Sequence, residues 1–216
     1  MSSFDKYNTK EINEKDKNHH LHPWQIFDLF AKDGALPIVK GEGAYVYDSD
    51  GNRYLDAVGG LWCTNIGQGR EDMVEAITQQ VRELAYSNIF VDGTNPRAAE
   101  LCVKLAELSP GNLNHVFLSC GGSTAVDSAY RLIQYYQNSR GKTEKKHFIS
   151  RINSYHGSTY LAMSLGGKPL DHSPLFEYVT DNIHHLSCPN YYRAPTAGSE
   201  TEFVDSLVKE FEDKIA

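Results

Sequence analysis

Residues 121–124, Gly-Gly-Ser-Thr, have the residue types of an anion-binding turn. They follow an apolar run at 115–119 and precede a stretch that predicts a helix over 123–138. Glycines allow close approach to the backbone, and the first N–H groups of a helix are unpaired and lie at the positive end of its dipole. The pattern fits a phosphate-binding turn, and it fits an ordinary strand–helix loop with a Ser or Thr cap equally well. It matches neither the Walker A nor the GxGxxG motif.

A second candidate is the segment 154–159, Ser-Tyr-His-Gly-Ser-Thr, which also lies between a predicted strand and a helical stretch. Ligands gather at the carboxyl ends of strands in α/β sheets. Tyr155 or His156 could stack there on a flat cofactor ring. A capped turn with an aromatic packing residue would have the same sequence, so the segment alone does not decide between the two.

Histidines and cysteines are the remaining candidates for ligands. His19, His20 and His22 lie close together, but we identify no carboxylate or cysteine partner at ligand spacing, so the sequence predicts no metal site and a mobile or helix-leading segment. The four cysteines are scattered, form no CxxC pair and are expected to be mostly small buried hydrophobic residues. Free thiols without a secretion signal indicate a reducing cytoplasm.

The elements that would position these residues alternate between strands and helices. Strands are expected at 115–119, 147–150 and 183–186, and helices at 123–138, 158–165 and 202–215, which favours an α/β domain with a mostly parallel sheet. Upstream, the pattern predicts helices at 23–34, 71–84 and 96–108 and a β-hairpin around the turn DSDGN at 48–52. That turn lacks the glutamate of a calcium loop, so we interpret it as structural.

Three segments follow: a polar tail (1–20), an N-terminal helix and hairpin segment (21–66), and a partial large domain (67–216). The last helix is not followed by another strand, and a sheet of two or three strands has unpaired edges, so the domain is expected to be incomplete. The net charge of −7 argues against general nucleic-acid binding. No apolar run is long enough to suggest a membrane partner.

Four segments, in this order and spacing, resemble the class III pyridoxal-phosphate (PLP) dependent aminotransferases, often called ω-transaminases. They are GEGAYVYDSDGNRYLDAVGGLWCTNIGQGRED, YSNIFVDGTNPRAAELCVKLAELSPG, HVFLSCGGSTAVDSAYRLIQYY and SYHGSTYLAMSLGG. The resemblance covers about 21–216. It implies the large domain of a fold-type I PLP-transferase, pyridoxal 5'-phosphate as cofactor, and a homodimer with its active site at the subunit interface.

The resemblance also implies roles for individual residues. Gly122 and Ser123 correspond to positions that bind the cofactor phosphate, and Tyr155 to the ring that stacks on the pyridine. His156 and Gly157 complete that motif.

In the substrate pocket, Trp62 corresponds to an aromatic residue, and Phe90 to a residue that acts across the dimer interface. Many members have GSEAND where this chain has GSTAVD, with Thr124 and Val126 as the replacements. Similar segments occur in pyruvate-using relatives, which favours an amine or ω-amino acid donor of taurine or β-alanine type with pyruvate or a similar keto acid as acceptor.

The family's cofactor-binding lysine matches no residue here, so no catalytic residue is assigned, and the 216-residue chain alone is expected to be inactive. Lys168 matches no catalytic motif and is expected in a surface loop. Two alternatives stay open: a class III relative with decarboxylase or aminomutase chemistry, and a non-catalytic fragment or binding module.

Overall fold

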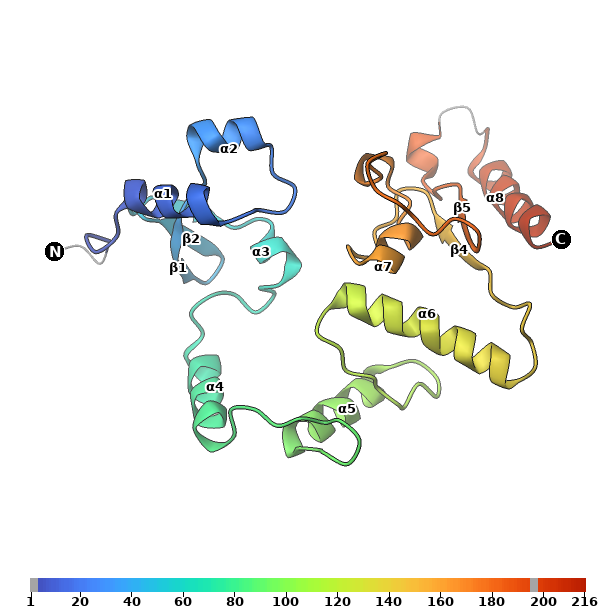
Figure 1. Ribbon diagram of the computed structural model, residues 1–216, viewed down its shortest axis with the longest axis horizontal. Coiled ribbons are helices and arrows are strands. Elements are labelled where there is room, and N and C mark those ends of the chain that lie inside the picture. The colour runs from blue at the N-terminus through green and yellow to red at the C-terminus, as the bar shows by residue number, and fades with distance from the viewer. Residues whose placement is uncertain (1–3, 195–197) are drawn as a thin grey trace. The chain divides into compact units, whose positions relative to one another are not determined.

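The computed structural model describes residues 4–194 and 198–216 of the chain (Figure 1). The chain divides into two compact units. The first unit is Met1–Pro96 and the second is Arg97–Ala216. Each unit has its own sheet. The segment boundaries predicted from the sequence, near residues 20 and 66, do not coincide with the boundary between these units and stay predictions.

The first unit is built on a three-stranded antiparallel sheet of β1 (Ile38–Glu42), β2 (Tyr45–Asp48) and β3 (Arg53–Leu55), in that order. The hairpin expected around residues 48–52 is the β2–β3 connection. Asp48 closes it, because one carboxylate oxygen accepts hydrogen bonds from the backbone N–H groups of Asp50 and Asn52. The other oxygen accepts from the Asn52 amide and the Tyr54 hydroxyl. Both oxygens of the Asp48 carboxylate therefore accept hydrogen bonds within the hairpin, which agrees with the interpretation of this turn as structural.

Helix α1 (Thr9–His19) lies within the predicted polar tail, of which residues 1–3 lie outside the described part of the chain. The segment is polar and buries no side chain. It is helical because Asn8 caps it and because Lys17 bonds to the end of α2 (Phe27–Asp33). Lys17 reaches the carbonyls of Ala31 and Lys32 at the end of α2, at 2.9 and 3.3 Å. These polar contacts order a segment that has almost nothing apolar to bury.

The other helices of this unit follow the sequence closely. Helix α2 ends at Asp33, and the φ of +74° at the following Gly34 suits the predicted stop, but the helix begins at Phe27 and not at Pro23. Helix α3 is the short turn Gly59–Trp62, and α4 is Glu71–Glu83. The apolar residues of α4 lie at helical spacing, as predicted, and each is at least 40% exposed: Met73, Val74, Ile77 and Val81.

The second unit contains α6 (Gly122–Ser139), α7 (Tyr160–Leu165) and α8 (Glu200–Ile215) around the parallel strands β4 (Phe148–Arg151) and β5 (Ile183–Leu186). Helix α5 (Pro96–Leu108) begins at the boundary between the units, and two 3-10 turns lie at Pro169–Asp171 and Tyr191–Arg193. The parallel pair, with α7 in the crossover, confirms the α/β class.

The core of the second unit lies between α6, α7 and the two strands. Tyr130, Leu165 and Ile183 are buried together, and Phe148 stacks on Tyr130 with ring centroids 3.8 Å apart. Helix α8 is held to β5 because the Glu210 carboxylate accepts the Ser187 backbone N–H at 3.1 Å. This core fixes where the amino-terminal ends of α6 and α7 lie.

Two predictions are wrong. Residues 115–119 form no strand, because nothing in the described part of the chain pairs with them; Phe117 is 67% exposed. The four cysteines are free thiols, as expected, but none is buried. Within the described residues, no helix combines the length and the apolar character needed to cross a membrane.

Candidate functional site

Helix α6 begins without a side-chain cap. Gly121, the residue before it, is extended, and the first helical hydrogen bond runs from Ala125 N–H to the Gly121 carbonyl at 3.0 Å. Among the described residues, nothing accepts a hydrogen bond from the N–H groups of Gly122, Ser123 and Thr124. A side chain at Gly121 or Gly122 would meet nothing within 4 Å. Three unpaired donors therefore lie at the positive end of a helix, with open space beside Gly121 and Gly122, and such an arrangement binds anions.

The hydroxyl of Ser123 connects this turn to the second candidate segment. Its oxygen accepts a hydrogen bond from the backbone N–H of Ser158 at 2.9 Å. Because a hydroxyl also has a proton to donate, Ser123 keeps one donor for a ligand. The two segments that the sequence presented separately thus meet at one place in the second unit.

Gly157 makes this contact close. It is buried, and a Cβ added there would lie 2.4 Å from Ser123 Oγ and 2.8 Å from Ser123 Cα. Its backbone φ of +138° is also one that residues other than glycine rarely adopt. Glycine is therefore required at 157 by both space and backbone conformation.

Asp127 is a structural residue of the site that the sequence analysis missed. One of its carboxylate oxygens accepts hydrogen bonds from the Thr159 hydroxyl at 2.9 Å and from the Ala162 backbone N–H at 3.1 Å. It thereby caps the beginning of α7 from the neighbouring helix. A signal was present, because Asp127 follows Ser123 by four residues and so lies on the same face of α6.

Tyr155 and His156 occupy different environments in the loop after β4. The Tyr155 side chain is exposed (60%) and free to meet a ligand. His156 is half-buried, with its Nε2 3.1 Å from the hydroxyl of Ser150, a buried residue of β4. The Ser150 hydroxyl also contacts that of Ser154 at 3.1 Å. His156 thus anchors the loop to the strand, and this anchor positions Tyr155.

Trp62 and Phe90 belong to the first unit. Both are about four-fifths exposed. Trp62 and Leu61 have φ values of +64° and +60°, which non-glycine residues adopt rarely and at a cost in strain. The pocket roles of Trp62 and Phe90 stay predictions. The five residues predicted to bind the cofactor, in contrast, lie at the junction of the two segments in the second unit.

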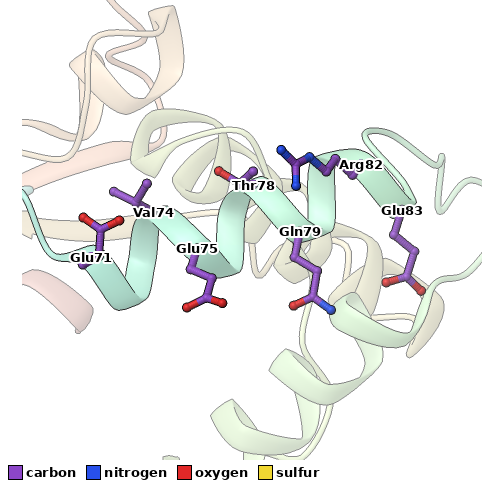
Figure 2. A pocket seen from close by; sticks show the side chains of 7 residues that line it. All are labelled: Glu71, Val74, Glu75, Thr78, Gln79, Arg82 and Glu83. Atoms are coloured by element: carbon purple, nitrogen blue, oxygen red, sulfur yellow. The ribbon is translucent and has the colours of Figure 1, made fainter.

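One further hollow lies along a single helix. Figure 2 shows this hollow, whose seven lining residues all come from α4, including Glu71, Glu75 and Arg82, and whose side chains leave the helix separately. Lys168 forms an ion pair with Asp171 three residues later, at 3.2 Å, and its side chain is half exposed. These contacts indicate a surface role for Lys168.

Comparison with known protein families gives one match over most of the chain: the family model of aminotransferase class-III covers residues 30–216. The putrescine–pyruvate aminotransferase of Pseudomonas aeruginosa is 38% identical over 207 residues, which are 96% of this chain and 45% of that protein. The mitochondrial gamma-aminobutyrate transaminase 1 of Oryza sativa subsp. japonica is 36% identical over 215 residues, 97% of this chain and 41% of that protein.

A solved structure shows the same likeness in three dimensions. The ω-transaminase of Pseudomonas jessenii, in complex with PMP, matches with a TM-score of 0.91 at 38% identity. The match covers 94% of this chain and 45% of that one. The chain thus spans less than half the length of the relatives that it matches.

Proposed function

The chain belongs to the class III aminotransferases, and we propose that it forms the cofactor-holding part of an enzyme that moves an amino group from an amine or ω-amino acid to pyruvate or a similar keto acid. The proposed cofactor is pyridoxal 5'-phosphate, the aldehyde counterpart of the PMP bound to the P. jessenii relative. The observation that carries the proposal is the junction of the α6 amino terminus with the Tyr155 loop through Ser123 and Ser158.

The residues of this junction fit the chemistry of the cofactor. A phosphate group needs several donors and a positive potential, and the unpaired N–H groups of Gly122, Ser123 and Thr124 offer both. The Ser123 hydroxyl adds a fourth donor. A flat pyridine ring needs an apolar face to rest on, and Tyr155 has an exposed ring in the adjoining loop.

Bound PLP supplies an electron sink for bond breaking at the carbon that carries the amine. The residues of this chain do the positioning. The α6 N–H groups and Ser123 hold the phosphate, and Tyr155 sets the plane of the ring. Gly157 and Asp127 keep the two segments at a fixed separation. None of them is assigned a proton transfer, and the lysine that binds the cofactor covalently in this family matches no residue of the chain.

The relatives support a donor with a primary amine at the end of a short chain. Putrescine and gamma-aminobutyrate, named for two of them, share this group, and pyruvate is named as acceptor for one. Donors of taurine and β-alanine type have the same terminal amine. We assign Trp62 and Phe90 to the pocket that binds the amine donor, with Phe90 acting across a dimer interface.

We further propose a homodimer in the cytoplasm. Helix α4 has an exposed apolar face (Met73, Val74, Ile77 and Val81). Such a face supports an interface in which a second copy, or another part of the enzyme, covers it. The four free thiols support a reducing compartment.

The test is a product analysis of the natural protein loaded with PLP. Putrescine, gamma-aminobutyrate, β-alanine and taurine are each supplied with and without pyruvate. Alanine formed only when both donor and pyruvate are present supports the proposal. Release of carbon dioxide, or a rearranged amine formed without pyruvate, would replace it with decarboxylase or aminomutase chemistry. PLP binding with no turnover of any donor would favour a binding module.

A further inference from the structure

Three side chains of the first unit converge at the carboxyl-terminal end of α1: Asp16, His20 and His22. The His20 Nδ1 lies 2.9 Å from one oxygen of the Asp16 carboxylate, and the His22 Nε2 lies 2.9 Å from the other. The two imidazole rings are 4.0 Å apart between centroids. One ligand atom from each residue can be chosen so that all lie within 4.8 Å of one another.

This arrangement corrects the interpretation from the sequence that these histidines have no carboxylate partner at ligand spacing. Asp16 precedes His20 by four residues, so both lie on one face at the end of the helix. His20 ends the helix in an extended conformation (φ −113°, ψ 126°). The chain therefore turns back, and His22, which lies outside the helix, reaches the second oxygen of Asp16.

The surroundings hold these side chains in place while leaving an entrance. The Asp16 side chain is 19% exposed and that of His22 is 30% exposed. The His22 ring also packs against Phe30 of α2, with centroids 5.0 Å apart. His20 is 60% exposed, so the cluster opens to solvent on its side.

The local electrostatics favour a cation. The cluster contains one carboxylate and lies at the negative end of the α1 dipole. Both lysines next to Asp16 are engaged elsewhere: Lys15 with the Glu11 carboxylate, and Lys17 with the carbonyls of Ala31 and Lys32. Their ammonium groups therefore do not pair with the Asp16 carboxylate.

We propose that Asp16, His20 and His22 bind a divalent transition metal ion of the zinc, nickel and copper class. Two imidazoles and a carboxylate are ligands that these ions prefer, whereas calcium and magnesium prefer oxygen alone. Ligands about 2.0–2.1 Å from a metal are roughly 2.9 Å apart at right angles and roughly 3.3 Å apart at the tetrahedral angle that zinc prefers. The two nitrogen–oxygen separations, each 2.9 Å and each to a different oxygen of Asp16, equal the shorter of these distances.

Binding needs a change of tautomer in both rings and replacement of the two hydrogen bonds to Asp16 by bonds to the metal. In the metal-free state each ring nitrogen facing Asp16 carries the proton of the hydrogen bond. In the bound state that nitrogen presents its lone pair to the metal, and the proton resides on the other nitrogen of the same ring. Water completes the coordination on the open side. The ion then ties the end of α1 to the segment leading into α2.

Isothermal titration of the tag-free natural protein with nickel chloride, and separately with zinc chloride, tests this site at neutral pH. We expect one ion per chain for the wild type. Asp16→Asn and His22→Gln should each weaken binding at least about tenfold, because each removes a direct ligand and even loss of an outer partner costs 10–100-fold. His19→Gln is the matched control, since His19 is a neighbouring histidine outside the cluster, and it should bind as the wild type does.

Equal weakening in His19→Gln and His22→Gln would overturn the proposal, because it would indicate loose binding by any surface histidine. Wild-type binding by Asp16→Asn would overturn it as well. If the variants fail to fold, copper-induced broadening of amide resonances in the wild type gives the answer. Broadening should begin around residues 16–22; a centre at another histidine, such as His115, would refute the site.

Discussion

The hydroxyl oxygen of Ser123 accepts a hydrogen bond from the backbone N–H of Ser158 at 2.9 Å, although the two residues are 35 positions apart in the sequence. The first lies in the opening turn of α6 and the second just before α7. A donor set suited to phosphate and a ring suited to stacking are thereby parts of one structure. A change on either side of this bond is expected to alter both.

Replacing Gly157 by alanine tests how close this contact is. The added Cβ would lie 2.8 Å from Ser123 Cα, and a backbone atom cannot move away without shifting α6. Overpacking of this kind costs roughly 1–3 kcal/mol of stability. We expect the Gly157→Ala variant to unfold at lower urea concentration than the wild type and to bind PLP more weakly.

The control is Gly141→Ala. Gly141 also has a positive φ, +71°, but a Cβ there would meet nothing within 4 Å. This variant carries the conformational cost without the clash, so its loss of stability should be smaller and its PLP affinity unchanged. Equal effects of the two substitutions would mean that backbone strain, and not the contact with Ser123, makes glycine necessary at 157.

Asp127 is expected to hold the start of α7. Asp127→Ala leaves the Ala162 N–H without its acceptor and removes the bond from Thr159, which should cost about 1–3 kcal/mol in the free energy of unfolding. Hydrogen exchange should accelerate in residues 158–162 before it does so elsewhere in the second unit. Asp205→Ala, at an exposed position of α8, is the control and should leave exchange in that segment unchanged.

Local sequence patterns predicted the elements well where hydrogen bonds are made within a segment. The hairpin, α4 and α5 follow directly from spacing and turn residues. The failures depend on distant partners. Residues 115–119 have a strand-like pattern, but a strand needs a neighbour. The polar α1 is ordered by contacts with the end of α2, which no pattern within residues 9–19 shows.

The candidate site was predicted in its residues but not in its connections. Glycine and serine at 121–123 indicated a turn with free donors, because that property is local. The bond from Ser158 to Ser123 and the reach of Asp127 to α7 depend on how the core around Tyr130 sets two helices side by side. For the same reason, Asp16 was overlooked as a partner of His22, since the chain must turn back beyond α1 to join them.

Acid should weaken the β2–β3 hairpin through Asp48. The Asn52 side chain donates to this carboxylate and, helped by Tyr54 and two backbone N–H groups, lowers its pKa below the ordinary value even though burial raises it. A carboxyl with a lowered pKa stabilises the folded state above about pH 4, the ordinary value, and this stabilisation is lost as the pH falls through the lower folded-state pKa.

We therefore expect Asp48→Asn to be less stable than the wild type at pH 7, with a difference that shrinks below about pH 4. Tyr54→Phe removes one of the donors and should reduce the acid sensitivity without abolishing it. Urea unfolding followed at several pH values measures both effects. A deficit for Asp48→Asn that stays constant with pH would show that the charge of the carboxylate does not stabilise the turn.

Tyr155 provides the most direct test of the proposed cofactor site. If its exposed ring stacks on the pyridine, Tyr155→Ala should weaken PLP retention by about 0.5–1.5 kcal/mol beyond the loss of buried area, which is about 2- to 13-fold in the dissociation constant. Tyr155→Phe keeps the ring and should retain PLP nearly as the wild type does. Dialysis of the PLP-loaded natural protein, with absorbance of the remaining cofactor, gives the comparison. Equal retention by the alanine and phenylalanine variants would remove Tyr155 from the site, since a stacking residue must lose affinity when its ring is lost.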